Sequence, residues 1–133
     1  MEYEEVKKDY VRYRLNTAKQ DLKAANLLYE NSIYNAAVNR AYYAIFHAMR
    51  AVLAIDGVDF KKHSGVISYF NKEYIKKGVF DKRFSKIIQN ANISRTGSDY
   101  EDFYDVSKQE AKDKCAEAME FYEEIERYIF KMI

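Results

Sequence analysis

The chain of 133 residues contains no proline and only four glycines, and this shortage of helix breakers is the strongest constraint on its fold. Proline interrupts a helix because it lacks the backbone donor, and glycine weakens one because it loses the most backbone entropy on folding. We therefore expect an all-α fold of long, uninterrupted helices. With 48% hydrophobic and 32% charged residues, the composition is typical of a folded globular protein. A chain of this length predicts a single helical domain over residues 1–133.

Apolar residues recur at alternating spacings of three and four in the first and last predicted helices, as on one face of a helix. The first helix is expected over residues 4–29, and the last follows an S-x-x-E capping box. Segments 33–55, 63–77 and 81–95 predict the helices between them, and "SDYEDFYDV" is expected as a loop. The prediction is a four- to five-helix antiparallel bundle with 33–55 at its centre. The periodic positions are Val11, Leu15, Ala18, Leu22, Ala25 and Tyr29 in the first helix, and Ala111, Cys115, Ala118, Tyr122, Ile125, Ile129 and Met132 in the last, which Ser107 and Glu110 open.

Several classes of protein are disfavoured by what the sequence lacks. No apolar stretch approaches the roughly 18 uncharged residues of a membrane span, and "MEYEEVKKDYVRYR" contains no signal-peptide core, so we expect a cytoplasmic protein without membrane contact. The single cysteine cannot form an internal disulfide, and two histidines without a suitably spaced cysteine or carboxylate predict no metal site. Phosphate-loop and dinucleotide-binding motifs are absent. We expect no metal and no cofactor.

Charge is distributed unevenly, although the whole chain carries a formal net charge of only +1. Residues 61–95 contain nine basic and two acidic side chains, which is +7, whereas the residues from 96 onward contain five and eleven, which is −6. Two interpretations remain open. The basic segment binds phosphate, or it forms a solvated face that the acidic end neutralises within the bundle or across a dimer.

A polar stripe crosses the most apolar helix, in the run "NRAYYAIFHAMRAV" at residues 39–52. Arg40, Tyr43 and His47 stand at i, i+3 and i+7, which places them on one face. Because a buried guanidinium needs a compensating acceptor, we expect a carboxylate partner from the acidic loop, first of all Asp99. In one interpretation Arg40 ties the loop to the helix and His47 is a core residue. In the other, Arg40 and His47 line a cleft that binds phosphate and a base.

Aromatic residues of the predicted loop, Tyr100 and Tyr104 among them, lie outside the apolar seam and are candidates for stacking on a base or on a partner helix. His63 occupies the turn "KKHSG". There the sequence favours either a helix N-cap at Ser64 with His63 beside it or a ligand contact.

Three blocks occur in order along the chain: "NRAYYAIFHAMRAVL", "KKHSGVISYFNKEYIKKG" and "RTGSDYEDFYDVSKQEA". Together they resemble the HEPN-domain family, in particular its small single-domain prokaryotic branch, over about the whole chain. The resemblance implies a HEPN-type helical bundle that forms a homodimer. It also implies a partner, a minimal nucleotidyltransferase, in a toxin–antitoxin pair, and RNA cleavage without a metal in the active members.

Active members of that family carry an arginine followed, after four to six residues, by a histidine. Arg95 matches the arginine, but the corresponding positions hold Tyr100, Glu101 and Asp102. The resemblance therefore implies a nucleotide- or RNA-binding module that lacks the usual catalytic histidine, with Arg95 facing phosphate and Tyr100 as a residue that the partner could adenylylate. The alternatives are an active endoribonuclease with an unconventional base and a structural bundle. The candidate binding residues are Arg40, Tyr43, His47, His63, Asp99, Tyr100 and Tyr104.

Overall fold

The computed structural model describes the backbone of residues 2–100 and 105–133 and the side chains of 3–98 and 105–133. Within these residues the chain forms five α-helices and one π-helical turn, and no strand. The all-α prediction is therefore confirmed. The elements are α1 (Glu2–Glu30), α2 (Tyr34–Ile55), α3 (His63–Phe70), η1 (Asn71–Ile75), α4 (Arg83–Tyr100) and α5 (Lys108–Met132).

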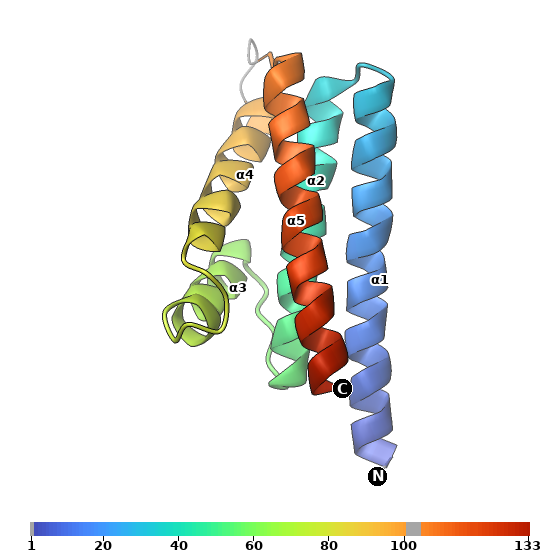
Figure 1. The fold of residues 1–133 in the computed structure, drawn as a ribbon, viewed down its shortest axis with the longest axis vertical. Coiled ribbons are helices and arrows are strands. Elements are labelled where there is room, and N and C mark those ends of the chain that lie inside the picture. The colour runs from blue at the N-terminus through green and yellow to red at the C-terminus, as the bar shows by residue number, and fades with distance from the viewer. Residues whose placement is uncertain (1, 101–104) are drawn as a thin grey trace.

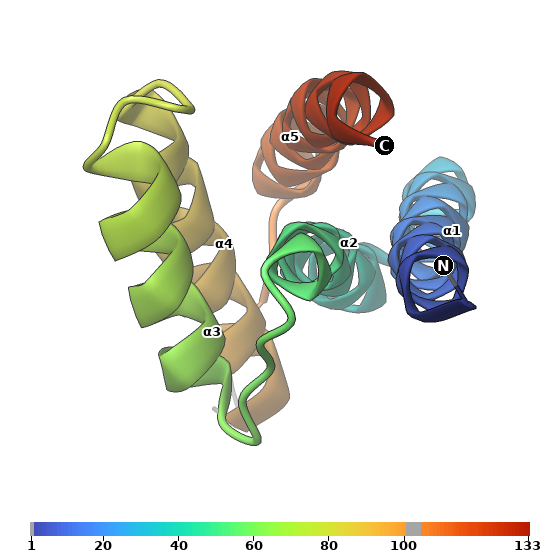
Figure 2. The same cartoon turned by 90° about the horizontal axis from the view of Figure 1, so that it is seen from below.

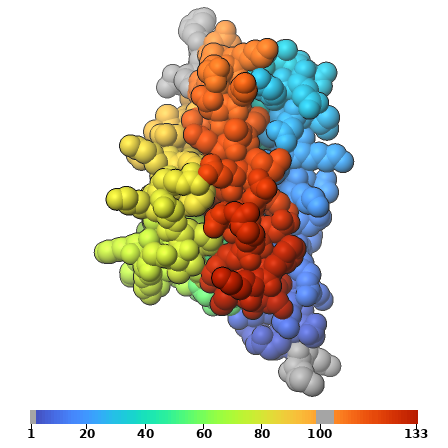
Figure 3. Space-filling model, in the orientation of Figure 1, coloured from blue at the N-terminus to red at the C-terminus, as the bar shows by residue number. Residues whose placement is uncertain are grey.

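The long helices α1, α2 and α5 run side by side along the longest dimension of the molecule, and α4 leans against them (Figure 1). Consecutive long helices run in opposite directions, so α1 and α4 ascend where α2 and α5 descend in that view. Seen along the bundle, α3 and α4 lie on one side of α2, and α1 lies on the other (Figure 2). The space-filling view shows α5 between the α3–α4 layer and α1 (Figure 3).

Helix α2 is the centre of the bundle, as its apolar sequence predicts, and it contacts each of the other four α-helices. Tyr42, Ile45, Met49 and Leu53 are completely or almost completely buried along it. Burying a large apolar side chain contributes roughly 1.5–3 kcal/mol, so this helix supplies a large part of the stabilisation. None of the helices in the described ranges is long and apolar enough to cross a membrane.

The periodic faces of the first and last helices are buried as predicted, with Tyr29 half-buried. Met132 is an exception, because its side chain is 52% exposed in the final turn of α5. Periodicity identifies a face but not the point along it where the neighbouring helices end. The N-terminus of α5 is as predicted, since the Ser107 hydroxyl accepts a hydrogen bond of 3.0 Å from the backbone N–H of Glu110.

Helix α4 is longer than the sequence predicts. It continues to Tyr100, so the first three residues of the expected loop, Ser98 to Tyr100, are helical, and the prediction of a loop there is wrong. The Thr96 hydroxyl donates to the carbonyl oxygen four residues earlier at 2.8 Å, and the Ser98 hydroxyl donates to the one three residues earlier at 3.2 Å. Such bonds let polar residues lie inside a helix. The part of the predicted loop at 101–104 falls outside the described residues.

The predicted third helix is divided into α3 and the π-helical turn η1, and it starts two residues earlier than an N-cap at Ser64 would require. Its observed N-cap is Lys62, which makes no side-chain capping bond, and His63 is the first helical residue. The N-cap prediction for Ser64 is therefore wrong. This start places the His63 side chain against α2, where the candidate site lies.

Candidate functional site

The polar stripe of α2 finds its carboxylate on α1. Arg40 Nη1 donates to Asp21 Oδ1 at 3.0 Å, and its Nε and Nη2 donate to Asn39 Oδ1 at 3.1 and 2.9 Å. His47 Nε2 lies 3.9 Å from the other oxygen of Asp21. The expectation that Asp99 is the partner of Arg40 is thus corrected, because α1 presents an aspartate across from the stripe. We call Arg40, Asp21 and His47 the Arg40 cluster.

Burial controls the ionisation of this cluster. Burial, followed by the positive charges of Arg50, Arg14 and Arg40, lowers the pKa of His47 to about 4. Burial also raises the pKa of Asp21, against the opposing effect of the Arg40 guanidinium. The imidazole is consequently neutral at pH 7, and its Nδ1 is buried with no hydrogen-bond partner among the described residues. Tyr43 completes the stripe, since the Arg40 guanidinium carbon lies 4.8 Å from its ring centroid.

A second group forms on the opposite side of α2, where α3 begins and α4 passes. The Arg95 guanidinium carbon lies 4.6 Å from the ring centroid of Tyr42. The Tyr42 hydroxyl oxygen lies 2.9 Å from His63 Nδ1, a hydrogen bond in which either atom can be the donor. The tertiary fold thereby brings His63 to Arg95, although 32 residues separate them in the sequence. We call Arg95, Tyr42 and His63 the Arg95 cluster.

The Arg95 cluster has a different charge balance. Its arginine donates from Nη2 to the neutral amide oxygen of Asn92 at 2.8 Å. Among the described side chains no carboxylate forms an ion pair with it, and its Nε is buried with no hydrogen-bond partner. Burial and then Arg95 and Arg50 lower the pKa of His63, so its imidazole is neutral at pH 7. Burial raises the pKa of Tyr42 to about 12, which keeps its hydroxyl protonated.

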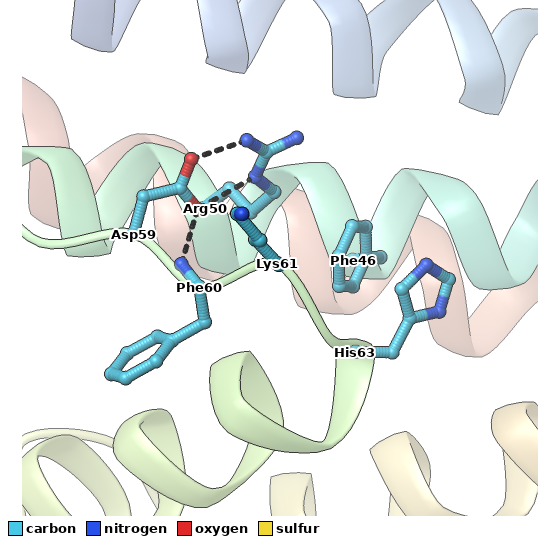
Figure 4. Close-up of a pocket in the computed structure, with 6 residues that line it drawn as sticks. All are labelled: Phe46, Arg50, Asp59, Phe60, Lys61 and His63. Carbon is cyan, nitrogen blue, oxygen red and sulfur yellow. Dashed lines mark hydrogen bonds and ion pairs between the residues drawn. The ribbon is translucent and has the colours of Figure 1, made fainter.

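His63 also lines a hollow of about 370 Å³ between α2 and the segment that precedes α3 (Figure 4). Its ring packs against Phe46, with centroids 4.1 Å apart. On the other side Arg50 Nε donates to Asp59 Oδ1 at 3.1 Å, and the two side chains face each other in the figure. That bond is the main reason why the pKa of Asp59 is lowered. Phe60 and Lys61 complete the lining.

These geometries allow distinct chemistry. A guanidinium that has no carboxylate partner can bind the oxygens of a phosphate group, and it does so with directed hydrogen bonds. A neutral imidazole can accept a proton, provided that one ring nitrogen carries a lone pair toward the substrate. Histidine, tyrosine and phenylalanine rings beside these groups can stack on a base. The Arg95 cluster combines all three, and the Arg40 cluster has its arginine already neutralised.

The predicted site residues therefore separate into two places. Arg40, Tyr43 and His47 lie together as the sequence predicts, and Tyr43 also contacts His63, with ring centroids 5.7 Å apart. Asp99 and Tyr100 belong to the last turn of α4, and their side chains, like Tyr104 as a whole, lie outside the described residues.

Sequence reasoning missed Asp21 and Tyr42, the residues that connect each arginine to its histidine. Tyr42 is one of thirteen tyrosines and stands at a core spacing, so no local signal distinguishes it. Asp21 is a polar residue outside the apolar periodic positions of the first helix, so the sequence pattern alone assigns it to the solvent-exposed side. Among the described residues, no group of three or more histidine, cysteine, aspartate or glutamate side chains could hold a metal ion.

Comparison with known proteins gives consistent results. The family model of the HEPN domain matches residues 11–128. A "UPF0332 protein" of Thermotoga maritima is 34% identical over 92% of this chain and 93% of its own length. A relative from Methanocaldococcus jannaschii, which bears the name "Putative toxin MJ0605", is 36% identical over 70% of this chain and 69% of its own length.

Among solved structures, the crystal structure of ST0689, an archaeal HEPN homologue, superimposes with a TM-score of 0.63. It covers 90% of this chain and 97% of the other, at 18% sequence identity. At this identity the similarity concerns the fold alone, and it confirms the predicted architecture.

Proposed function

The chain belongs to the HEPN family, and from that premise we propose that it is a nucleotide- or RNA-binding module, the toxin-like partner of a minimal nucleotidyltransferase. The observation that carries the proposal is the Arg95 cluster. Its arginine lies on the Tyr42 ring without a carboxylate among the described side chains, and a neutral histidine lies beside it. An arginine in this state is available for an anion, and phosphate is the anion that a nucleic acid offers.

The two clusters have different roles in this proposal. Arg95 binds phosphate and His63 contacts the sugar or phosphate beside it. Arg40 and His47 stabilise the packing of α1 on α2, since Asp21 already satisfies Arg40. Tyr43 lies between the clusters and offers a ring edge toward His63. This assignment retains Arg95, His63 and Tyr43 as binding residues and removes Arg40 and His47 from direct contact with the ligand.

The family context supports the partner and the oligomeric state. Relatives of this chain carry toxin names, and toxins of this kind function beside an antitoxin. We propose a homodimer with a nucleotidyltransferase as the antitoxin. Tyr100 lies five residues beyond Arg95 at the end of α4, and it is the residue that the transferase would adenylylate.

A second function, metal-independent RNA cleavage, is favoured by one specific observation: the fold places His63 next to Arg95, where the motif histidine is missing from the sequence. If Nδ1–H donates to the Tyr42 oxygen, Nε2 carries the lone pair. His63 would then take the proton of a ribose 2′-hydroxyl, whose oxygen attacks the neighbouring phosphorus to form a 2′,3′-cyclic phosphate. The bond from phosphorus to the 5′-oxygen would break, and the leaving oxygen would take a proton from water to become a 5′-hydroxyl. Arg95 would stabilise the charge that develops on the phosphate oxygens.

One experiment distinguishes these functions. The purified protein and its Arg95→Ala variant are incubated with single-stranded RNA and EDTA across a salt series, and cleavage and gel shift are both followed. Arg12→Ala is the matched control, because Arg12 is an exposed arginine on α1 whose partner is Asp9, within the same helix. We expect binding that weakens with salt and is lost in Arg95→Ala but not in Arg12→Ala.

Each other outcome is informative. Cleavage by the wild type that disappears in Arg95→Ala would make this protein a nuclease and assign the second function. Equal RNA binding by all three proteins would contradict the role of Arg95. Absence of both binding and cleavage, even at low salt, would overturn the proposal and leave a structural bundle.

A further inference from the structure

A groove of about 840 Å³ lies between the α3–η1 segment and α4, which run beside each other on one side of α2 (Figure 2). We call it the α3–α4 groove. It is more than twice the volume of the hollow beside Arg50. Its lining consists mainly of basic, amide and hydroxyl side chains with two isoleucines: His63, Ser64, Ile67, Ser68, Asn71, Lys72, Ile75, Lys76, Lys82, Ser85 and Asn92.

The charge of this groove has one sign. Lys72, Lys76 and Lys82 are exposed along it, and no acidic side chain lines it within the described part of the chain. The nearest acid of the same segment, Glu73, forms an ion pair with Lys77, which also lies outside the lining. Lysine ammonium groups are flexible and can follow phosphates whose positions vary, and the neutral donors between them can hydrogen-bond to the same phosphates. A groove of this kind can therefore bind the repeated phosphates of a nucleic-acid backbone.

The groove is continuous with the Arg95 cluster. His63 lines both the groove and the hollow beside Arg50, so it stands where the two meet. At the α4 wall, Asn92 belongs to the groove and accepts the hydrogen bond from Arg95. A chain lying in the groove therefore passes the phosphate-binding residues of the proposed site.

The hollow on the other side of His63 has a different lining. Phe46 and Phe60 line it with aromatic residues, beside the Lys61 ammonium group and the ion pair of Arg50 with Asp59 (Figure 4). Such a combination suits one unpaired base with its phosphate, because base stacking on an aromatic side chain contributes about 1–3 kcal/mol. A duplex cannot use it, since paired bases are stacked on each other.

From these observations, and resting on the proposed function, we infer that the ligand is a single-stranded RNA several nucleotides long rather than a free nucleotide. Its phosphate backbone lies in the α3–α4 groove along Lys72, Lys76 and Lys82. It passes Arg95 and His63, and the next base enters the hollow beside Phe46 and Phe60.

The test measures fluorescence anisotropy with a labelled single-stranded octanucleotide RNA, using adenosine monophosphate and a duplex of the same length as competitors. The groove variant is K72E/K76E, and the control is K19E/K23E. Both pairs are exposed lysines four residues apart, and both changes alter the net charge equally. Lys72 lies in η1 and Lys76 directly follows it, whereas Lys19 and Lys23 lie in α1. The control pair lies on α1, across α2 from the groove (Figure 2). Urea unfolding verifies that both variants are folded.

We expect K72E/K76E to weaken octanucleotide binding at least about tenfold and K19E/K23E to change it less than about threefold. The slope of log K against log salt should fall by about 1.4 in the groove variant, because two phosphate contacts are lost. Adenosine monophosphate and the duplex should compete at least about tenfold more weakly than the unlabelled octanucleotide.

Failure of this inference can be separated from failure of the proposed function. If the wild type binds the octanucleotide and Arg95→Ala weakens it, but the two lysine variants behave alike, the groove assignment is wrong and the function stands. Monophosphate competing as well as the octanucleotide would overturn the polynucleotide ligand. A groove variant that changes only the sedimentation of the protein would assign the groove to a second copy of the chain. If the wild type binds no RNA, the function itself fails.

Discussion

An arginine–histidine cluster lies on each of two sides of helix α2, and the clusters differ in the residue that stands between the arginine and the histidine. Toward α1, Arg40 and His47 share the carboxylate of Asp21. Toward α3 and α4, the hydroxyl and ring of Tyr42 stand between Arg95 and His63. Asp21 neutralises the Arg40 guanidinium, whereas the protonated Tyr42 leaves Arg95 with no carboxylate partner among the described side chains. The same two residue types thus form a charge-compensated contact between helices in one place and, within the described residues, an uncompensated cation in the other.

The surroundings reinforce this difference. His47 is 19% exposed at its side chain, and its lowered pKa of about 4 shows how strongly its environment disfavours a positive charge. His63 lines two hollows that open to solvent. Burial lowers the pKa of both histidines, and therefore a shifted pKa alone does not identify the functional one.

The largest expected effect concerns the pH dependence of stability at His47. Its pKa is about 4 in the folded protein and near 6.5 when unfolded, so below pH 6.5 the unfolded chain binds a proton that the folded one does not. Stability is full above that pH and falls as the pH is lowered. Between pH 7 and pH 5 the wild type should lose about 2 kcal/mol more than His47→Gln, measured by urea unfolding.

In this difference the contribution of His63 cancels except for its repulsion with His47, because both proteins retain it. The charges that face His47 are those of Arg50, Arg14, Arg40 and protonated His63, with Asp21 opposite. Parallel pH profiles for the two proteins would show that His47 is not held neutral by the fold.

A smaller effect is expected when the carboxylate of the Arg40 cluster is removed. Asp21→Ala leaves the partly buried Arg40 without its carboxylate partner, although Asn39 still accepts from it, and should lower the free energy of unfolding by about 1–2 kcal/mol at pH 7. Asp21→Asn should retain most of the stability, because an amide oxygen still accepts from Arg40 and burial disfavours the charged carboxylate. Urea unfolding of the two variants side by side tests this order, and equal losses would contradict it.

The smallest effect on stability is expected at Arg95. Its described contacts are a cation–π interaction with Tyr42 and a hydrogen bond to Asn92, so Arg95→Ala should cost only about 0.5–1 kcal/mol. Thermal or urea unfolding measures it alongside the RNA-binding assay. A loss above about 2 kcal/mol would mean that Arg95, like Arg40, is chiefly a structural contact, and the contrast between the two clusters would disappear.

The sequence predicted the helices well where a repeated apolar face was involved. Positions such as Val11 and Leu22 on α1, and Ala118 and Ile125 on α5, are buried because a regular helix brings every third or fourth residue to one side. The wrong predictions concern the residues at which a helix, or its buried face, begins or ends. Ser98 is helical rather than in a loop, Lys62 rather than Ser64 is the N-cap of α3, and Met132 lies where burial ends.

For the candidate site, sequence reasoning selected most of the residues and misassigned their partners. The spacing of Arg40 and His47 on one face was sufficient to predict that they lie together. It did not predict Asp21, because the carboxylate comes from another helix whose rotation and register follow from packing. The resemblance to the HEPN family selected Arg95 and showed that its histidine was missing.

The sequence alone determines the helical period, the central position of α2 and the basic middle segment. Each of these depends on residues that are close together in the chain. Which of the two arginines has a carboxylate partner among the described side chains depends on long-range contacts. The proximity of His63 to Arg95 exists only because α3 and α4 pack on the same side of α2 and enclose Tyr42. Side-chain pairing between helices follows from their packing geometry, which no short stretch of sequence contains.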